Sequence, residues 1–152
     1  MNGDDGMQTG TIAWAWKKLS EHCGLSQDLV TLNSRGDMIS KHFSRYEFTC
    51  KCGCGFGCCD IELFGILERI REAFGPVFIL SGCRCVNHNA RVGGATNSLH
   101  VMGMAADFKV RGASPEQIVH WLNNHYPGRY GIGRYKTWTH LDVRRTQARW
   151  GE

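Results

Sequence analysis

The chain has 152 residues, 42% of them hydrophobic, which is enough for one compact domain with its own core. Its net charge is +4, and its 18 Lys and Arg residues are scattered along the sequence instead of forming a block. This mild excess suits an anionic polymer surface and does not say which one. There is no run of about 18 apolar residues, so we expect no membrane span.

The N-terminal part predicts an extension of the domain. The first ten residues are polar and acidic, which is the wrong start for a secretory signal, so we expect cytoplasmic synthesis. Residues 11–23 place Ile12, Trp16 and Leu19 at helical spacing, and residues 33–37 are typical of a turn or linker. We therefore expect residues 1–38 to form a helical extension that covers the core.

The rest of the chain predicts an α+β fold with a small antiparallel sheet and flanking helices. Apolar positions recur at helical spacing over residues 61–74, and Ser114-Pro115 is typical of the start of a helix, which we expect to run through Asn123. Residues 87–97 predict an ordered loop. The expected strands are residues 77–80 and 105–110, with an antiparallel pair over residues 130–135 and 138–143.

Three residues could meet at a metal ion. His100 and Asp107 are separated by Gly103, which permits a tight turn, and His140 on its expected strand is the best third ligand. Strand alternation places Trp138, His140 and Asp142 on one face. Two His and one carboxylate with an open water position are the composition of a catalytic zinc site, which we expect in a cleft on the sheet.

The residues around these ligands carry a resemblance to a known family. The sequence resembles the zinc D-Ala-D-Ala carboxypeptidase family, which includes phage L-alanyl-D-glutamate endopeptidases and vancomycin-resistance D,D-dipeptidases. The resemblance extends from about His42 to Trp150. Its motifs are Ser81-Gly82-Cys83-Arg84, His88-Asn89-Ala90, Val92-Gly93-Gly94-Ala95, Asn97-Ser98 and the stretch from His100 to Asp107.

This resemblance implies a role for each matched residue. His100, Asp107 and His140 would bind Zn²⁺, Arg84 would bind the substrate carbonyl or its oxyanion, and Ser98 would contact the carboxylate end of the substrate. Zinc would lower the pKa of its bound water toward about 7, so that hydroxide attacks the amide. The resemblance thus implies that residues 39–152 form a zinc peptidase domain that cleaves stem peptides of peptidoglycan.

The general base is the weak point of this assignment. Many relatives carry a carboxylate three residues before the last zinc His, where this chain has Thr137, and Trp138 replaces a His found in other branches. Asp142 could act as the base, or it could form an ion pair with Arg84 or Arg144. A catalytically inactive zinc-binding protein, as in the hedgehog domains of this fold class, is the alternative function.

Eight cysteines raise a separate question. Five lie between Cys50 and Cys59, and Cys83 and Cys85 flank Arg84. A cysteine-bound structural zinc ion, disulfides and free thiols are all compatible with this pattern, although C-x-C-x-C is not the usual zinc spacing. A zinc module that binds nucleic acid is the weakest alternative, because no basic and aromatic surface accompanies the cysteines.

These predictions imply a partner and a setting. We expect a peptidoglycan stem peptide as substrate, no nucleic acid and a monomer that acts on the cell wall after release, as many phage lysis enzymes do. The N-terminal extension could instead be the remnant of a wall-binding module. His88 could line the cleft, although hydrogen bonding on the surface is the simpler role for it.

Overall fold

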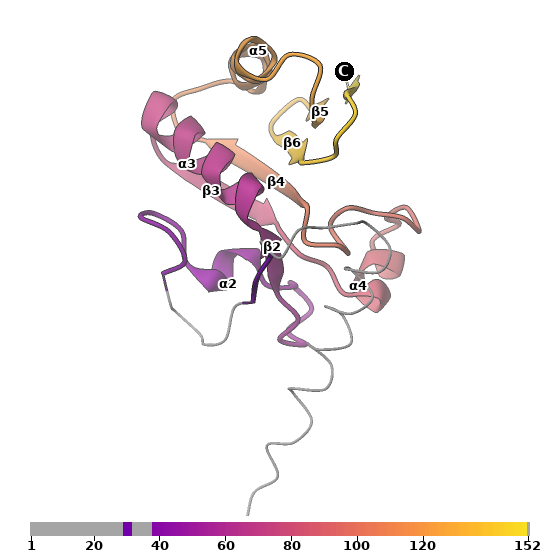
Figure 1. Ribbon diagram of the computed structural model, residues 1–152. Helices are drawn as coiled ribbons and strands as arrows, with labels where there is room; N and C mark the ends of the chain where they lie inside the picture. Colours follow the sequence, from indigo (N-terminus) through magenta and orange to yellow (C-terminus); the bar gives the residue numbers. More distant parts are fainter. Residues whose placement is uncertain (1–28, 32–37, 152) are drawn as a thin grey trace, which may run out of the picture.

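The computed structural model describes residues 29–31 and 38–151 (Figure 1). The predicted helix over residues 11–23 and the predicted turn over residues 33–37 lie outside these residues. Strand β1 (Leu29–Thr31) pairs antiparallel with β2 (Cys58–Asp60), so a short piece of the predicted extension contacts the domain. None of the helices in the described part of the chain is long and apolar enough to cross a membrane.

A five-stranded sheet forms the centre of the fold. In spatial order it contains β3 (Val77–Ser81), β4 (Ala105–Val110), β6 (Thr139–Asp142), β5 (Gly131–Arg134) and β7 (Ala148–Gly151). The predicted α+β class and the predicted antiparallel pair β5–β6 are confirmed. The predicted antiparallel pairing holds for β3, β4, β6 and β5, but β7 pairs parallel to β5, so the sheet is mixed and not strictly antiparallel.

Local signals set the ends of the two long helices. Helix α3 (Ile61–Phe74) begins after Asp60, whose side chain accepts a hydrogen bond from the Glu62 amide, and ends at Gly75 with φ of 102°. Helix α5 (Pro115–His125) begins with a capping box between Ser114 and Gln117. Each matches its predicted start.

Two short helices lie nearer the cysteines. Helix α2 (Arg45–Phe48) precedes the cysteine-rich loop, and helix α4 (Val86–Arg91) follows Cys85. The expected loop over residues 87–97 is therefore wrong in its first part. The Cys85 side chain caps α4 by accepting a hydrogen bond from the amide of His88, a role for which cysteine is not a usual choice.

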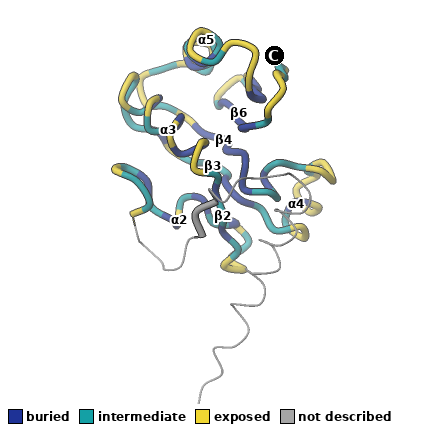
Figure 2. Tube along the Cα trace, in the orientation of Figure 1, coloured by how far each residue is buried: buried dark blue, intermediate teal, exposed yellow. Residues whose placement is uncertain are grey.

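The two faces of the sheet differ in composition. Phe108 and Leu141 point to the face that packs on α3 and α5, where they join the buried apolar core. Figure 2 shows this burial as dark blue along β4 and β6. Because side chains alternate along a strand, Asp107 and His140 lie on the opposite face. One face stabilises the fold, and the other carries the polar residues.

Candidate metal centre

Strand register brings the candidate residues into one row across the sheet. Asp107 on β4 lies opposite Ser81 on β3 and His140 on β6. His140 in turn lies opposite Gly133 on β5, which is paired with Trp150 on β7. Residues far apart in the sequence therefore become neighbours through ordinary cross-strand pairing.

His100 reaches this row from a turn. Gly103 has φ of 70°, and a Cβ atom there would lie 2.7 Å from the Cys58 sulfur, so glycine is required for both conformation and space. The turn closes through the Met104 amide, which donates to the Leu99 carbonyl at 2.9 Å. The predicted turn between His100 and Asp107 is thus present.

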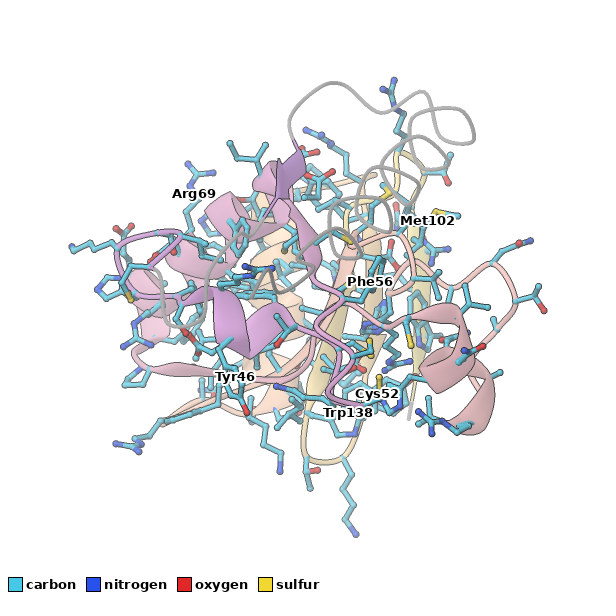
Figure 3. All side chains as sticks on the ribbon, turned by 90° about the horizontal axis from the view of Figure 1, so that it is seen from below. Tyr46, Cys52, Phe56, Arg69, Met102 and Trp138 are labelled. Carbon is cyan, nitrogen blue, oxygen red and sulfur yellow. The ribbon has the colours of Figure 1, made fainter. Side chains whose placement is uncertain are left out.

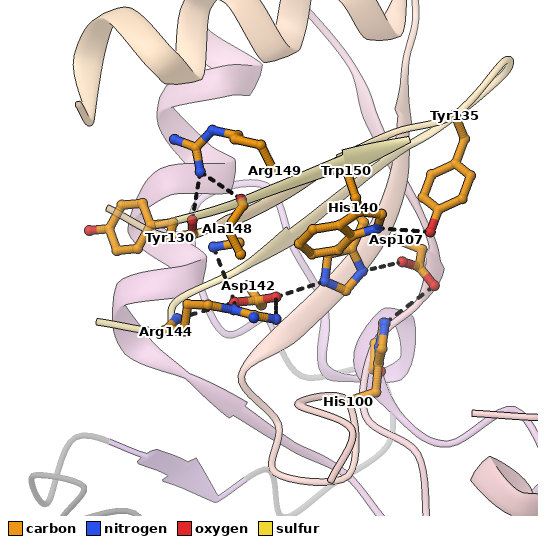
Figure 4. A network of polar contacts seen from close by, with 12 residues as sticks. His100, Asp107, Tyr130, Tyr135, His140, Asp142, Arg144, Ala148, Arg149 and Trp150 are labelled. Atoms are coloured by element: carbon orange, nitrogen blue, oxygen red, sulfur yellow. Dashed lines mark hydrogen bonds and ion pairs between the residues drawn. The ribbon is translucent and has the colours of Figure 1, made fainter. Parts of the chain in front are cut away.

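The three side chains converge (Figure 4). One potential ligand atom from each of His100, Asp107 and His140 lies within 4.8 Å of the others. Asp107 Oδ2 is 3.3 Å from His100 Nε2, and Asp107 Oδ1 is 2.8 Å from His140 Nδ1. His100 and Asp107 are buried, and His140 is partly buried.

In each imidazole, the ring nitrogen that does not face Asp107 has a hydrogen-bond partner of its own. His100 Nδ1 lies 2.7 Å from the Gly82 carbonyl oxygen, to which it donates, and His140 Nε2 lies 3.0 Å from Asp142 Oδ2. Imidazoles that bind metals in proteins almost always donate their second N–H to such an acceptor, which fixes the tautomer. The donor set and its support therefore fit zinc.

Charges within the site affect each other. Burial alone would raise the pKa of Asp107, but its contacts with His100 and His140 hold it well below the usual range. Burial alone would lower the pKa of His140, but its contacts with Asp107 and Asp142 raise it. Asp107 and His140 therefore stabilise each other's charged forms, a role that a bound cation would take over.

Arg84 contacts one of the candidate ligands directly. Its Nη2 atom donates to Asp107 Oδ2 at 2.8 Å, and its Nε atom donates to Ser81 Oγ at 2.9 Å. Its backbone amide donates to the His100 carbonyl at 3.0 Å. The guanidinium is therefore fixed next to the three candidate ligands.

Asp142 is fully buried and has several partners. It forms a two-point ion pair with Arg144, at 2.7 Å for each oxygen, and accepts a hydrogen bond from the Gly131 amide at 3.2 Å. Burial alone would raise the pKa of Asp142, but its contacts with His140 and Arg144 lower it to about 2. The ion pair with Arg144, one of the alternatives raised by the sequence, is present.

Three other residues discussed from the sequence lie outside this network. Ser98 lies in the turn before His100, and its hydroxyl makes no hydrogen bond to another described residue. Thr137 lines a small pocket with Phe108 and Ile118, on the α5 side of the sheet. His88 is half-buried on α4.

Sequence reasoning missed several neighbours of the site. The Trp150 ring lies 5.0 Å from the His140 ring, and its Nε1 donates to Tyr135 Oη at 3.0 Å. Tyr135 stacks on Trp138 at 3.7 Å. Gly133 makes room for Trp150, since a Cβ atom there would lie 2.6 Å from the indole nitrogen. The Gly-Ile-Gly stretch of β5 is the sequence signal for these aromatic contacts, because a strand without side chains at two positions leaves room for large neighbours.

Comparison with known proteins gives the family. The family model described as Peptidase M15 matches residues 41–142, which include Arg84 and the three candidate ligands. A search of curated proteins found no match. Because the family match covers more than half of the chain, the protein belongs to the peptidase M15 family of zinc-dependent peptidases, which act on peptidoglycan-type substrates.

Proposed function

We propose that this protein hydrolyses an amide bond in the stem peptide of bacterial peptidoglycan, as a D,D-carboxypeptidase or an endopeptidase. The observation that carries the proposal is the convergence of His100, Asp107 and His140, with the Arg84 guanidinium on the same carboxylate. A charged donor beside a zinc-type ligand set is suited to peptide hydrolysis.

The protein side chains would hold and orient the reacting groups. His100, Asp107 and His140 would bind Zn²⁺, with the imidazoles oriented by Gly82 and Asp142. A bound zinc ion supplies a Lewis acid that activates water and polarises a carbonyl. The rigid strands β4 and β6 keep Asp107 and His140 in register for this task.

Arg84 is the proposed electrostatic catalyst. Two of its N–H groups bind Ser81 and Asp107, and a guanidinium has five. The remaining donors are proposed to bind the substrate carbonyl oxygen and to stabilise the charge that develops there. Ser98, close to His100 in the chain, is proposed to contact the carboxylate end of the substrate.

The predicted role of Asp142 as general base stays a prediction. A general base needs a lone pair within reach of the proton that it accepts. Asp142 is fully buried, and its two oxygens already bind His140, Arg144 and Gly131. These contacts favour a positioning role, in which Asp142 orients His140.

The test is hydrolysis by zinc-loaded protein. Substrates are purified peptidoglycan, a synthetic stem peptide ending in D-Ala-D-Ala and one containing the L-alanyl-D-glutamate bond, with products identified by mass spectrometry. We expect cleavage by the wild type and a loss of at least about 100-fold in His100→Ala. His120→Ala, which changes an exposed His on α5, should retain the activity. Equal activity in wild type and His100→Ala would contradict the proposal.

A second candidate function is zinc binding without catalysis. Two observations favour it: Thr137 occupies the place of the family's carboxylate, and the nearby Asp142 is buried. Stoichiometric zinc bound through His100 and His140, with no turnover of any of the three substrates, would establish this alternative over the peptidase.

The proposal also covers the setting of the protein. Peptidoglycan lies outside the cytoplasmic membrane, so we propose that the protein acts after its release from the cell that makes it. We also propose that it acts as a monomer, which light scattering of the active protein would test.

A further inference from the structure

Four thiols gather near the segment of chain that carries Arg84, and one of them belongs to Cys85, the next residue. The Sγ atoms of Cys50, Cys52, Cys54 and Cys85 all lie within 4.8 Å of one another. Figure 3 shows sulfur atoms close to the labelled Cys52. Among the described residues, this group and His100, Asp107 and His140 are the two sets that could hold a metal ion.

The sulfur separations match a tetrahedral ion site. A Zn–S bond of about 2.3 Å implies about 3.8 Å between two sulfurs on one ion. Cys50 and Cys52 have their sulfurs 3.3 Å apart, and those of Cys52 and Cys85 are 3.7 Å apart. Small side-chain rotations would bring four such sulfurs to equal distances from a common centre.

Two glycines let the unusual C-x-C-x-C spacing work. Gly53 and Gly55 have φ of 80° and 77°, so the chain turns tightly between and after the thiols. The Gly53 amide donates to the Cys50 carbonyl at 3.2 Å, and the Cys50 amide donates to the Phe56 carbonyl at 2.8 Å. Three thiols from five consecutive residues can therefore point to one place.

Backbone amides support two of the sulfurs. The Cys85 amide donates to Cys50 Sγ at 3.3 Å, and the His88 amide donates to Cys85 Sγ at 3.3 Å. Hydrogen bonds of this kind orient metal ligands from outside the coordination shell. The first of them also joins the cysteine loop to the segment that follows β3.

We propose that Cys50, Cys52, Cys54 and Cys85 bind a second, structural Zn²⁺ ion, separate from the His100, Asp107 and His140 site. Four thiolates form a closed coordination shell, which is typical of structural zinc and leaves no position for substrate. The ion fastens the loop of residues 50–54 to Cys85, the residue next to Arg84. The metal assignment itself does not depend on peptidase activity.

The main alternative is disulfide bonding. Cys58 and Cys83 form a different close pair, with sulfurs 3.0 Å apart, and neither belongs to the group of four. This pair provides a matched control, because Cys58→Ser removes a nearby thiol without removing a proposed ligand. Cys54 is the ligand to change first, since it is exposed and its replacement leaves the core intact.

The test counts metal ions in the full chain, purified under reducing conditions, loaded with zinc and freed of excess metal. We expect two ions per chain in the wild type and in Cys58→Ser, and one in Cys54→Ser and in His100→Ala. Wild-type metal content in Cys54→Ser would overturn the proposal. So would a wild type with a single ion that His100→Ala abolishes, or mass spectrometry showing disulfides among the four cysteines.

Cobalt gives a readout independent of the count. With Co²⁺ in place of zinc, His100→Ala should retain the strong thiolate-to-metal charge-transfer absorption, and Cys54→Ser should lose most of it. Circular dichroism of each variant would check that it is folded. Two bound ions without turnover on any wall peptide would refute the proposed peptidase and leave the cysteine site standing. Turnover with no thiolate absorption would support the peptidase and overturn the cysteine site.

Discussion

Asp142 shows how one buried carboxylate can connect several parts of a site. It accepts from the Gly131 amide, pairs with Arg144 and lies 3.0 Å from His140 Nε2. Since its burial would be costly without partners, its contacts explain why a charge is tolerated there. Two roles remain distinguishable by experiment, namely proton acceptor and orienting partner of His140.

We predict that Asp142→Asn weakens zinc binding by about 10- to 100-fold, because the amide holds the His140 ring less firmly. The measurement is competition with a chromogenic chelator. The pH profile and kcat of the zinc-saturated variant provide the second readout. If Asp142 is the general base, the variant keeps its zinc affinity, kcat falls and the acidic limb of the pH profile disappears. If Asp142 only positions His140, zinc affinity falls and the zinc-saturated variant keeps most of its kcat and the acidic limb.

Strand β5 contributes to the site through two glycines, which leave room for neighbouring side chains. A Cβ atom on Gly131 would lie 2.2 Å from Asp142 Oδ2, and one on Gly133 would lie 2.6 Å from Trp150 Nε1. Both atoms belong to residues that contact His140. The glycines of this strand are therefore required by the packing around the candidate metal ligand His140.

We predict that Gly131→Ala lowers the free energy of unfolding by about 2 kcal/mol or more, because the new methyl group displaces a buried carboxylate. Zinc affinity should fall with it. The matched control is Gly65→Ala in α3, where no atom lies within 4 Å of the new Cβ. That change should stabilise the protein by about 0.5–1 kcal/mol. Urea unfolding of both variants measures the difference, and equal effects would contradict the packing argument.

The segment before α2 is attached to α3 by one carboxylate. Glu68 accepts a hydrogen bond from the His42 amide at 2.8 Å, and its other oxygen is 2.6 Å from His42 Nδ1. Burial alone would raise the pKa of Glu68, but hydrogen bonds from Ser40 and His42 lower it. The ionised Glu68 side chain therefore stabilises the fold above the pKa of an unfolded Glu, about 4.3. This contribution is lost as the pH falls through the lower pKa that Glu68 has in the folded protein.

We predict that Glu68→Gln costs about 1 kcal/mol of unfolding free energy at pH 7, and that this difference from the wild type shrinks below about pH 4. The partial exposure of the pair keeps the expected cost small. Glu72→Gln, on the exposed side of the same helix, serves as control and should follow the wild type. A cost that persists undiminished at pH 3 would show that the lost contacts are not those of a carboxylate.

Local patterns predicted some elements well and others poorly. The apolar period and the flanking Asp60 and Gly75 predicted α3, because both signals lie within the helix and its caps. Strand β7 was missed because Ala148–Gly151 has no alternating pattern, and its parallel pairing with β5 depends on a long-range contact. Helix α4 was missed because its cap is Cys85.

The residues of the site also fall into some that were predicted and some that were missed. Resemblance supplied His100, Asp107 and His140, and the structure brings them together. Spacing alone could not have done so, since Asp107 meets His140 only through the register of β4 and β6. The contribution of Trp150 depends on β7, whose placement next to β5 was not predicted. Long-range pairing is thus the information that local sequence reasoning lacks.

At the scale of the whole molecule, the two candidate ion sites flank one segment of chain. Arg84 binds Asp107 through its side chain, and its neighbour Cys85 belongs to the thiol group. Cys83 is tied to α2 by its amide, which donates to the Phe48 carbonyl at 2.8 Å. The end of β3 is therefore the place where the helical part, the cysteine loop and the sheet meet.

Zinc removal should consequently affect the whole fold. Because an ion that binds only the folded state adds RT ln(1 + [L]/Kd) to stability, free zinc at 1,000 times Kd contributes about 4 kcal/mol per site. We predict that a strong chelator lowers the wild-type Tm, and that His100→Ala and Cys54→Ser each lose only part of this response. The measurement is calorimetry with and without chelator, in the presence of a reductant. The double variant should show no response to zinc, and a full wild-type response in Cys54→Ser would confine the metal to the His100, Asp107 and His140 site.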